Sequence, residues 1–228
     1  MTVLSQAVED YLKTIFGLAG SRESVQTGAL AEALAVAPAS VSGMVRRLAD
    51  AGLVERAAYR GVRLTDRGRR AALRVIRRHR ILETYLAQAL GWDWDVVHEE
   101  AERLEHAASD QLIERMAEVL DDPRYDPHGA PIPTKEGEVE QQELVPMSEV
   151  AVGTLGEVRM VSDDDPKRLR YIGSLGFRVG ARFEVLETMP FRGPVTVRLM
   201  DTGARPQVIG FELAQSLLSF PLGQEVAV

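Results

Sequence analysis

The chain has 228 residues, of which 45% are hydrophobic, no cysteine, and a formal net charge of −7. This length suits two or three domains with hydrophobic cores of their own. The lack of cysteine excludes disulfides, thiolate chemistry and zinc-finger sites, so any metal must be held by oxygen and nitrogen. No stretch approaches the roughly 18 apolar residues that a membrane span needs. The N-terminal MTVLSQAVEDYLK lacks the features of a signal peptide, so we expect a cytoplasmic protein without a membrane partner.

The charges are distributed unevenly along the chain. Residues 37–80 carry twelve arginines against three acids, a local balance of +9, whereas residues 93–150 have a balance of −13. A basic segment inside an acidic protein indicates a polyanionic partner that is contacted by one face only. The acidic segment is where a cation would be held.

The first part of the chain predicts a helix-turn-helix. Residues 5–19 have helical periodicity, and Thr27 is a plausible N-cap for a short second helix. After a turn at residues 35–37, a third helix is expected to begin at Pro38 and to end at Gly52. Two helices joined by such a short turn form a helix-turn-helix, although a plain helical hairpin is the alternative.

Residues 53–55 and 62–65 predict the two strands of a wing. The small residues at the start of the third helix permit close approach to bases, which favours a winged helix that binds DNA. Within this helix we expect Val41, Val45 and Leu48 to pack inward. The residues expected to face DNA are Thr27, Ala37, Pro38, Ala39, Ser40, Ser42, Gly43, Arg46, Arg47, Tyr59 and Arg60.

Two long helices are predicted next, over residues 67–90 and over about seven turns at residues 92–120. The arginines of the first could contact DNA phosphates or form a solvated face. The second carries a long apolar stripe, which needs a partner and therefore predicts a homodimer. The central residues of this stripe are Leu104, Ala108, Leu112 and Met116.

The stretch HEEAERLEH, at residues 98–106, has the residue types of a metal site. On a helix, one face would carry His98, Glu102, Glu105 and His106. Two imidazoles and two carboxylates beside an apolar core are costly unless they are paired. A divalent cation pairs them directly, whereas a solvated charged face is the alternative. His79 and Glu83, four residues apart on the preceding helix, and His128 also combine imidazole with carboxylate.

Residues 121–147 are rich in proline and acid, which indicates a linker. Asp126 and His128 within it could return to a metal. From Ser148 the periodicity changes to that of strands, and five or so short strands in about 80 residues predict a small SH3-like barrel. Strands are expected within residues 151–161, 182–186 and 195–200, and short helices at 166–175 and 212–218.

Taken together, these segments resemble the diphtheria-toxin-repressor family of metal-dependent transcriptional regulators, on its manganese-responsive side. The resemblance covers essentially the whole chain. It rests on VEDYLKTI, LAEALAVAPASVSGMVRRL, GLVERAAYRGVRLTDRG, RRHRILE, HEEAERLEH and PHGAPIP, and the tail with LGFRVGARFEVLE and GPVTVRL is similar to a FeoA-like SH3 domain.

The resemblance implies two metal sites per subunit. The primary site would consist of Asp10, Glu102, Glu105 and His106. The ancillary site would consist of His79, Glu83 and His98, with Asp126, His128 and Asp163 as further candidates. Iron-type members have Met and Cys where Asp10 and Glu102 stand, and hard carboxylates in their place favour Mn²⁺, with Fe²⁺ second.

One residue departs from the family pattern. Small manganese regulators carry a glutamate where this chain has Lys13. We therefore expect one primary site and one ancillary site that recruits the SH3-like domain, rather than a closely coupled two-metal centre.

The resemblance implies an α+β multidomain protein that acts as a homodimeric repressor on a palindromic double-stranded DNA operator. A winged helix-turn-helix is expected at residues 1–73, a helical dimerisation and metal-binding domain at 74–140, and an SH3-like domain at 141–228. Metal would tie the first helix of the DNA-binding domain to the dimer core.

The sequence leaves two other classes of function to compare with this one. An enzyme is not expected, because Glu102 stands where the zinc-protease pattern HExxH needs histidine, and the chain has no P-loop or G-x-G-x-x-G signature. A di-iron bundle needs two Glu-x-x-His pairs, which this spacing does not supply. The remaining alternative is a winged-helix regulator that senses a small organic ligand and needs no metal.

Overall fold

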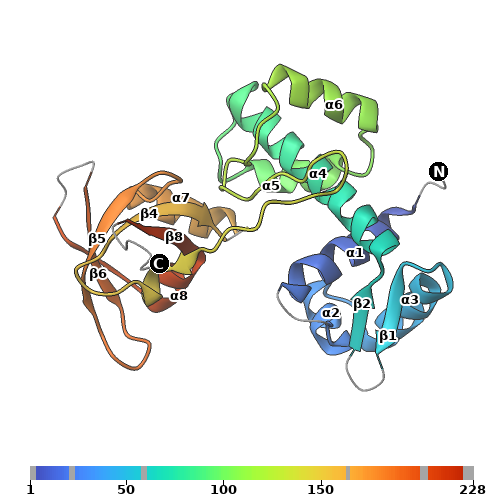
Figure 1. The fold of residues 1–228 in the computed structure, drawn as a ribbon, viewed down its shortest axis with the longest axis horizontal. Coiled ribbons are helices and arrows are strands. Elements are labelled where there is room, and N and C mark those ends of the chain that lie inside the picture. The colour runs from blue at the N-terminus through green and yellow to red at the C-terminus, as the bar shows by residue number, and fades with distance from the viewer. Residues whose placement is uncertain (1–3, 21–23, 58–60, 163–164, 201–204, 223–228) are drawn as a thin grey trace, which may run out of the picture. The chain divides into compact units, whose positions relative to one another are not determined.

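The computed structural model describes residues 4–20, 24–57, 61–162, 165–200 and 205–222 (Figure 1). Contacts divide the chain into two compact units, which are described separately. Unit 1 comprises Met1–His79, Glu102–Glu114 and Pro133–Val139, and unit 2 comprises Arg80–Ala101, Arg115–Ile132 and Glu140–Val228. The architecture is α+β, as the sequence predicted, with helices first and a sheet last.

Unit 1 contains the predicted helix-turn-helix, with α1 (Gln6–Ala19), α2 (Thr27–Ala33) and α3 (Pro38–Asp50). Pro38 occupies the first turn of α3, and Gly52 follows the helix with φ of +67°. Both ends therefore form as expected from proline and glycine chemistry. Thr27 is the first residue of α2 rather than its N-cap, because the extended cap position falls on Gln26.

The helices α2 and α3 are bent by 112° relative to each other, as in a helix-turn-helix. Among the described residues no single helix is long and apolar enough to cross a membrane, and only this bent pair passes a test of length and composition. The core beneath the pair is formed by Tyr11, Leu12, Ile15, Leu30, Val41, Val45 and Leu48.

The predicted wing is a two-stranded antiparallel sheet of β1 (Val54–Ala57) and β2 (Gly61–Leu64). An isolated bridge between Val25 and Val62 joins it to the segment before α2. Val54 and Val62 are buried in the same core as α3. The wing is thus fixed to α3 by shared packing. Tyr59 and Arg60, expected to face DNA, lie outside the described residues.

The long helix α4 (Asp66–Gln88) forms as predicted, but the single helix expected at residues 92–120 is wrong. Two shorter helices replace it, α5 (Val97–Leu104) and α6 (Asp110–Val119). The Ser109 hydroxyl accepts a hydrogen bond of 3.2 Å from the Leu112 N–H. A serine in this role starts a new helix, so the apolar spacing across residues 105–109 belongs to a turn.

Four of the α4 arginines pair with acids of the chain, whereas Arg69 and Arg70 near the start of the helix are exposed, so contact of these two with phosphates stays a prediction. Within unit 1, Arg78 lies 2.9 Å from Asp110, which also pairs with Arg74. Arg77 lies 3.0 Å from Glu114. Within unit 2, Arg80 lies 3.5 Å from Asp126. Four of the basic residues that made this segment appear polyanion-binding are therefore neutralised by acids of the same chain.

Unit 2 contains a six-stranded antiparallel sheet with the order β3-β8-β4-β5-β6-β7 (Figure 1). Its elements are β3 (Val145–Pro146), the 3₁₀ helix η1 (Met147–Glu149), β4 (Leu155–Val161), α7 (Pro166–Ser174), β5 (Arg182–Thr188), β6 (Val195–Leu199), β7 (Gln207–Ile209), α8 (Phe211–Ser216) and β8 (Leu217–Leu222). The sequence predicted this β-rich domain and both short helices.

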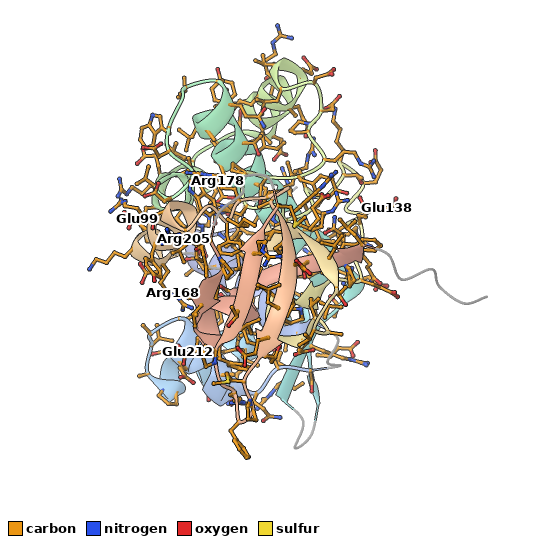
Figure 2. All side chains as sticks on the ribbon, turned by 90° about the vertical axis from the view of Figure 1, so that its left-hand side faces the viewer. Glu99, Glu138, Arg168, Arg178, Arg205 and Glu212 are labelled. Atoms are coloured by element: carbon orange, nitrogen blue, oxygen red, sulfur yellow. The ribbon has the colours of Figure 1, made fainter. Side chains whose placement is uncertain are left out.

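Trp94, from the segment between α4 and α5, is buried in the core of the sheet domain together with Leu169 and Phe177. Arg178, labelled in Figure 2, has its guanidinium carbon 5.0 Å from the centroid of the Trp94 ring. Asp95 next to it lies 2.8 Å from Arg170 of α7. The sheet domain is therefore anchored to this segment by one aromatic side chain and one ion pair.

The segment after α6 packs against β4 at Gly129. The Val161 N–H donates to the His128 carbonyl at 2.8 Å. Gly129 has φ of +88°, and a Cβ placed on it would lie 1.9 Å from the Arg159 carbonyl oxygen. Only glycine fits this conformation and this close approach.

We expect Gly129→Ala to lower the stability of unit 2 by about 1–3 kcal/mol, because the added methyl group forces the segment away from β4. The measurement is the midpoint of chemical unfolding. Gly153→Ala is the matched control, since Gly153 has a similar φ of +81° but nothing within 4 Å of the added atom. Equal losses in the two variants would show that the backbone conformation, and not the contact with Arg159, accounts for the effect.

Candidate metal centre

Three of the predicted primary ligands lie together in unit 1. Asp10 is on α1, whereas Glu105 and His106 are in the turn that follows α5, and their ligand atoms lie within 4.8 Å of one another. His106 Nε2 is 2.8 Å from Asp10 Oδ1 and 3.3 Å from Glu105 Oε1. The prediction that Glu105 and His106 share a helix face with His98 was wrong, because α5 ends at Leu104. The turn directs both side chains to α1.

Glu9 sets the orientation of the His106 ring. Its Oε2 lies 2.7 Å from His106 Nδ1, and since a carboxylate only accepts hydrogen bonds, Nδ1 carries the proton. The buried Nε2 atom finds no hydrogen-bond partner among the described residues. Nε2 nevertheless faces the carboxylates of Asp10 and Glu105, so it is placed to ligate a metal ion whenever it is not protonated. The residues present fit a divalent metal.

The pKa values of the two acids in this cluster shift in opposite directions. Burial raises the pKa of Asp10, against the effect of the neighbouring His106. Burial would also raise the pKa of Glu105, but the hydrogen bond with His79 and the charge of Lys13 outweigh it and lower the pKa. Glu105 is fully buried. An ionised carboxylate in such a place needs compensating positive charge.

Glu102, the fourth predicted primary ligand, lies beside this cluster rather than in it. Its carboxylate forms an ion pair with Lys13 of α1. Lys13 Nζ also lies 2.9 and 3.0 Å from the two oxygens of Glu105. His79 Nδ1 is 2.6 Å from Glu105 Oε2, so this residue, which the resemblance placed in the ancillary site, contacts the primary cluster.

A second cluster lies in unit 2 and contains Glu83, Asp126 and His128, all buried, with ligand atoms within 4.8 Å of one another. His98 Nδ1 lies 3.0 Å from Glu83 Oε1, and His128 Nδ1 lies 3.9 Å from Glu83 Oε2. The structure thus gathers four of the predicted ancillary residues. His79 precedes Glu83 by four residues on α4, and Asp163 lies outside the described residues.

The backbone of the Trp94 segment orients His128. His128 Nε2 lies 2.8 Å from the Trp94 carbonyl oxygen, which only accepts, so Nε2 is protonated and Nδ1 is the ring nitrogen that faces Glu83. Burial, together with the nearby Glu83, raises the pKa of Asp126. Two buried acids and two imidazoles at this spacing fit a second cation.

The described residues predicted to contact DNA are all exposed: Thr27, Ala37, Pro38, Ala39, Ser40, Ser42, Gly43, Arg46 and Arg47. On the opposite face of α3, Val41, Val45 and Leu48 are buried, as predicted. The Ser42 hydroxyl donates to the Pro38 carbonyl at 3.1 Å. The exposed face of α3 is therefore available to a partner.

Glu9 was not predicted as a site residue, because an acid that directly precedes Asp10 on a helix has no feature that indicates burial. Glu9 also lies 3.3 Å from Arg78, which pairs with Asp110. The orientation of His106 is thus linked through two ion pairs to the start of α6.

We expect Glu9→Ala to lower the affinity of this cluster for a divalent cation, probed with Mn²⁺, by about 10- to 100-fold, because the His106 ring loses the partner that fixes its tautomer. Titration calorimetry on the metal-free protein measures this change. Glu32→Ala, which removes an exposed acid of α2, serves as the control. An unchanged affinity in Glu9→Ala would show that His106 needs no such orientation.

Comparison with known protein families assigns all three parts of the chain. Residues 3–62 match the N-terminal DNA binding domain of iron dependent repressors. Residues 65–134 match the metal binding and dimerisation domain of the same proteins, and residues 145–218 match the FeoA domain.

Individual relatives agree with these matches. The chain is 32% identical over 199 residues to the diphtheria toxin repressor of Corynebacterium efficiens, covering 82% of this chain and 85% of the relative. It is 37% identical over 133 residues to the iron-dependent repressor IdeR of Mycobacterium tuberculosis, where the match covers 58% of each protein.

Solved structures are similar over nearly the whole chain. A manganese-dependent transcriptional repressor in complex with manganese is 39% identical, with a TM-score of 0.87 over 94% of this chain and all of that one. ScaR with bound Cd²⁺ is 28% identical, with a TM-score of 0.82 over 94% of this chain and 99% of that one. The chain therefore belongs to the diphtheria toxin repressor family of metal-dependent repressors and carries a FeoA domain at its C-terminal end.

Proposed function

We propose that this protein is a homodimeric, metal-dependent transcriptional repressor that binds a palindromic DNA operator when Mn²⁺ is plentiful, with Fe²⁺ as the second choice of metal. The observation that carries the proposal is the meeting of Asp10 on α1 with Glu105 and His106 after α5. Because these three ligands come from two separate segments, a bound ion would connect the two segments. The manganese-dependent repressor that this chain resembles supports the choice of metal.

The primary site would consist of Asp10, Glu105 and His106, with Glu102 as the fourth ligand. Asp10 is two residues from Leu12, which is buried in the same core as Val41 and Val45 of α3. Fixing α1 therefore fixes the recognition helix as well. If only this fixed arrangement matches two half-sites about one helical turn apart, metal favours it in the population. Such coupling amounts to roughly 1–3 kcal/mol.

The ligand chemistry supports manganese. The chain has no cysteine, and carboxylates stand at Asp10 and Glu102. Hard oxygen ligands suit Mn²⁺ better than a set that includes thiolate or thioether sulfur. A bound ion would supply positive charge that holds the carboxylates together, and it would catalyse no reaction.

An ancillary ion would be held by Glu83, His98, Asp126 and His128, with His79 contributing from the same helix as Glu83. This cluster contacts the Trp94 carbonyl, and the His128 carbonyl binds β4. An ion there would stiffen the segment on which the sheet domain is anchored. Each subunit would then hold one primary and one ancillary ion.

We assign residues 1–73 to the DNA-binding domain, 74–140 to the dimerisation and metal-binding domain, and 141–228 to the SH3-like domain. The dimer interface would lie on α5 and α6, where Leu104 is 37% and Leu112 is 47% exposed. Large apolar side chains left in water mark interfaces. Ala108 is buried within its own chain, so the interface stripe is narrower than the sequence indicated.

The test of this function is a gel shift on the DNA upstream of the protein's own gene. The metal-free protein should bind weakly after chelation and tightly after Mn²⁺ is restored. A regulator of the organic-ligand class would bind equally well in both conditions, which would contradict the proposal.

Asp10→Met combined with Glu102→Cys should abolish Mn²⁺-activated DNA binding while keeping the response to Fe²⁺, Co²⁺ or Ni²⁺. The change introduces sulfur ligands, and the thiol must ionise before it binds well. DNA-binding titrations with each metal, under reducing and anaerobic conditions, compare the variant with wild type. Activation of both proteins by Mn²⁺ to the same extent would exclude these two residues as the source of selectivity.

Arg46→Ala should weaken operator binding by about 1–3 kcal/mol if its side chain reads a base edge. Arg46 is exposed on α3. Titrations against the operator and against unrelated DNA separate this role from a phosphate contact, which would weaken both equally. Arg205→Ala is the control, because it removes one exposed arginine from the sheet domain (Figure 2). Wild-type affinity in Arg46→Ala would contradict docking by α3.

A further inference from the structure

We propose that Lys13 is a built-in cation that fills the second cation position beside the primary metal centre, so that this centre takes one divalent ion and not two. The inference rests on the proposed function and specifies the stoichiometry of its primary site. Lys13 does more than lack the carboxylate of a glutamate, because its ammonium group itself occupies the second cation position.

The contacts of Lys13 are those of a bound cation. Its Nζ atom lies 2.9 and 3.0 Å from the two oxygens of Glu105, forms an ion pair with Glu102, and lies 3.2 Å from His79 Nδ1. The ligand atoms of these three neighbours lie within 4.8 Å of one another. They form a set that could hold a metal ion, and the ammonium group of Lys13 donates to both of its carboxylates.

This set adjoins the primary cluster through Glu105. One oxygen of Glu105 faces His106 Nε2 at 3.3 Å, and the other faces His79 at 2.6 Å. Lys13 follows Asp10 by three residues on α1, so both side chains leave the same face of that helix. The two cation positions therefore share one buried carboxylate, and one of them already contains a charge that belongs to the chain.

The charges balance with a single ion. Three carboxylates, from Asp10, Glu102 and Glu105, carry −3, and one divalent ion together with Lys13 supplies +3. The nearby Glu9 is paired with Arg78. Two divalent ions beside Lys13 would bring +5 against −3 into a site where Glu105 is fully buried. Such an excess of charge is strongly unfavourable away from water.

A tethered ammonium also has an advantage over a free ion. Its position on α1 keeps it at a high effective concentration near Glu102 and Glu105. A second metal ion would have to displace it and leave the ammonium group without its carboxylates. In Lys13→Glu the tethered cation is lost and a fourth carboxylate is added. Four carboxylates then balance two divalent ions.

The experiment counts Mn²⁺ bound to the full-length protein by equilibrium dialysis and elemental analysis, with electron paramagnetic resonance on the same samples. We expect Lys13→Glu to bind one more ion per subunit than wild type and to show the exchange-coupled signal of two neighbouring Mn²⁺ ions. Lys13→Arg, which keeps the cation, should bind as many ions as wild type. Lys13→Gln removes the charge without adding a ligand and should bind the additional ion more weakly.

The outcomes separate this inference from the proposed function. An exchange-coupled pair in wild type, or equal counts in wild type, Lys13→Glu and Lys13→Gln, would overturn the role of Lys13 while leaving the primary site intact. If wild type bound no Mn²⁺, the proposed function itself would fail. Lys13→Gln adds no negative charge, so it gives a count even if Lys13→Glu folds poorly.

Discussion

The buried carboxylate of Glu105 is the constraint on which the centre of unit 1 depends. It has no contact with solvent, so its charge must be compensated by groups that the fold brings to it. Lys13 comes from α1 and His79 from α4, whereas Glu105 itself lies in the turn after α5. Three segments that are far apart in the sequence meet because one acid cannot stay ionised without them. A bound metal would use the same meeting point.

His106 and His128, one in each candidate metal cluster, are held in place in the same way. In each, one ring nitrogen donates to a protein oxygen, and the other faces carboxylates. Glu9 holds His106 and the Trp94 carbonyl holds His128. Both supports lie outside the expected ligands, and each belongs to a part that has to be positioned: α1 of the DNA-binding domain in one case, and the anchor of the sheet domain in the other.

Local signals explain what could be predicted from the sequence. Proline at position 38, glycine at position 52 and the spacing of Val41, Val45 and Leu48 define α3 by themselves. The break between α5 and α6 was missed because the apolar spacing continues through it, and the capping role of Ser109 was overlooked. The partners of Glu9, Lys13 and the α4 arginines depend on tertiary contacts, which no local pattern contains.

The pairing of those arginines has a consequence for DNA that is not an operator. Affinity for any duplex comes mainly from cations that displace counterions from phosphates. Because Arg74, Arg77 and Arg78 are already matched by Asp110 and Glu114, they have little charge to offer the backbone. These three arginines would therefore add less to the affinity for random duplex DNA than the number of basic residues in this segment suggests.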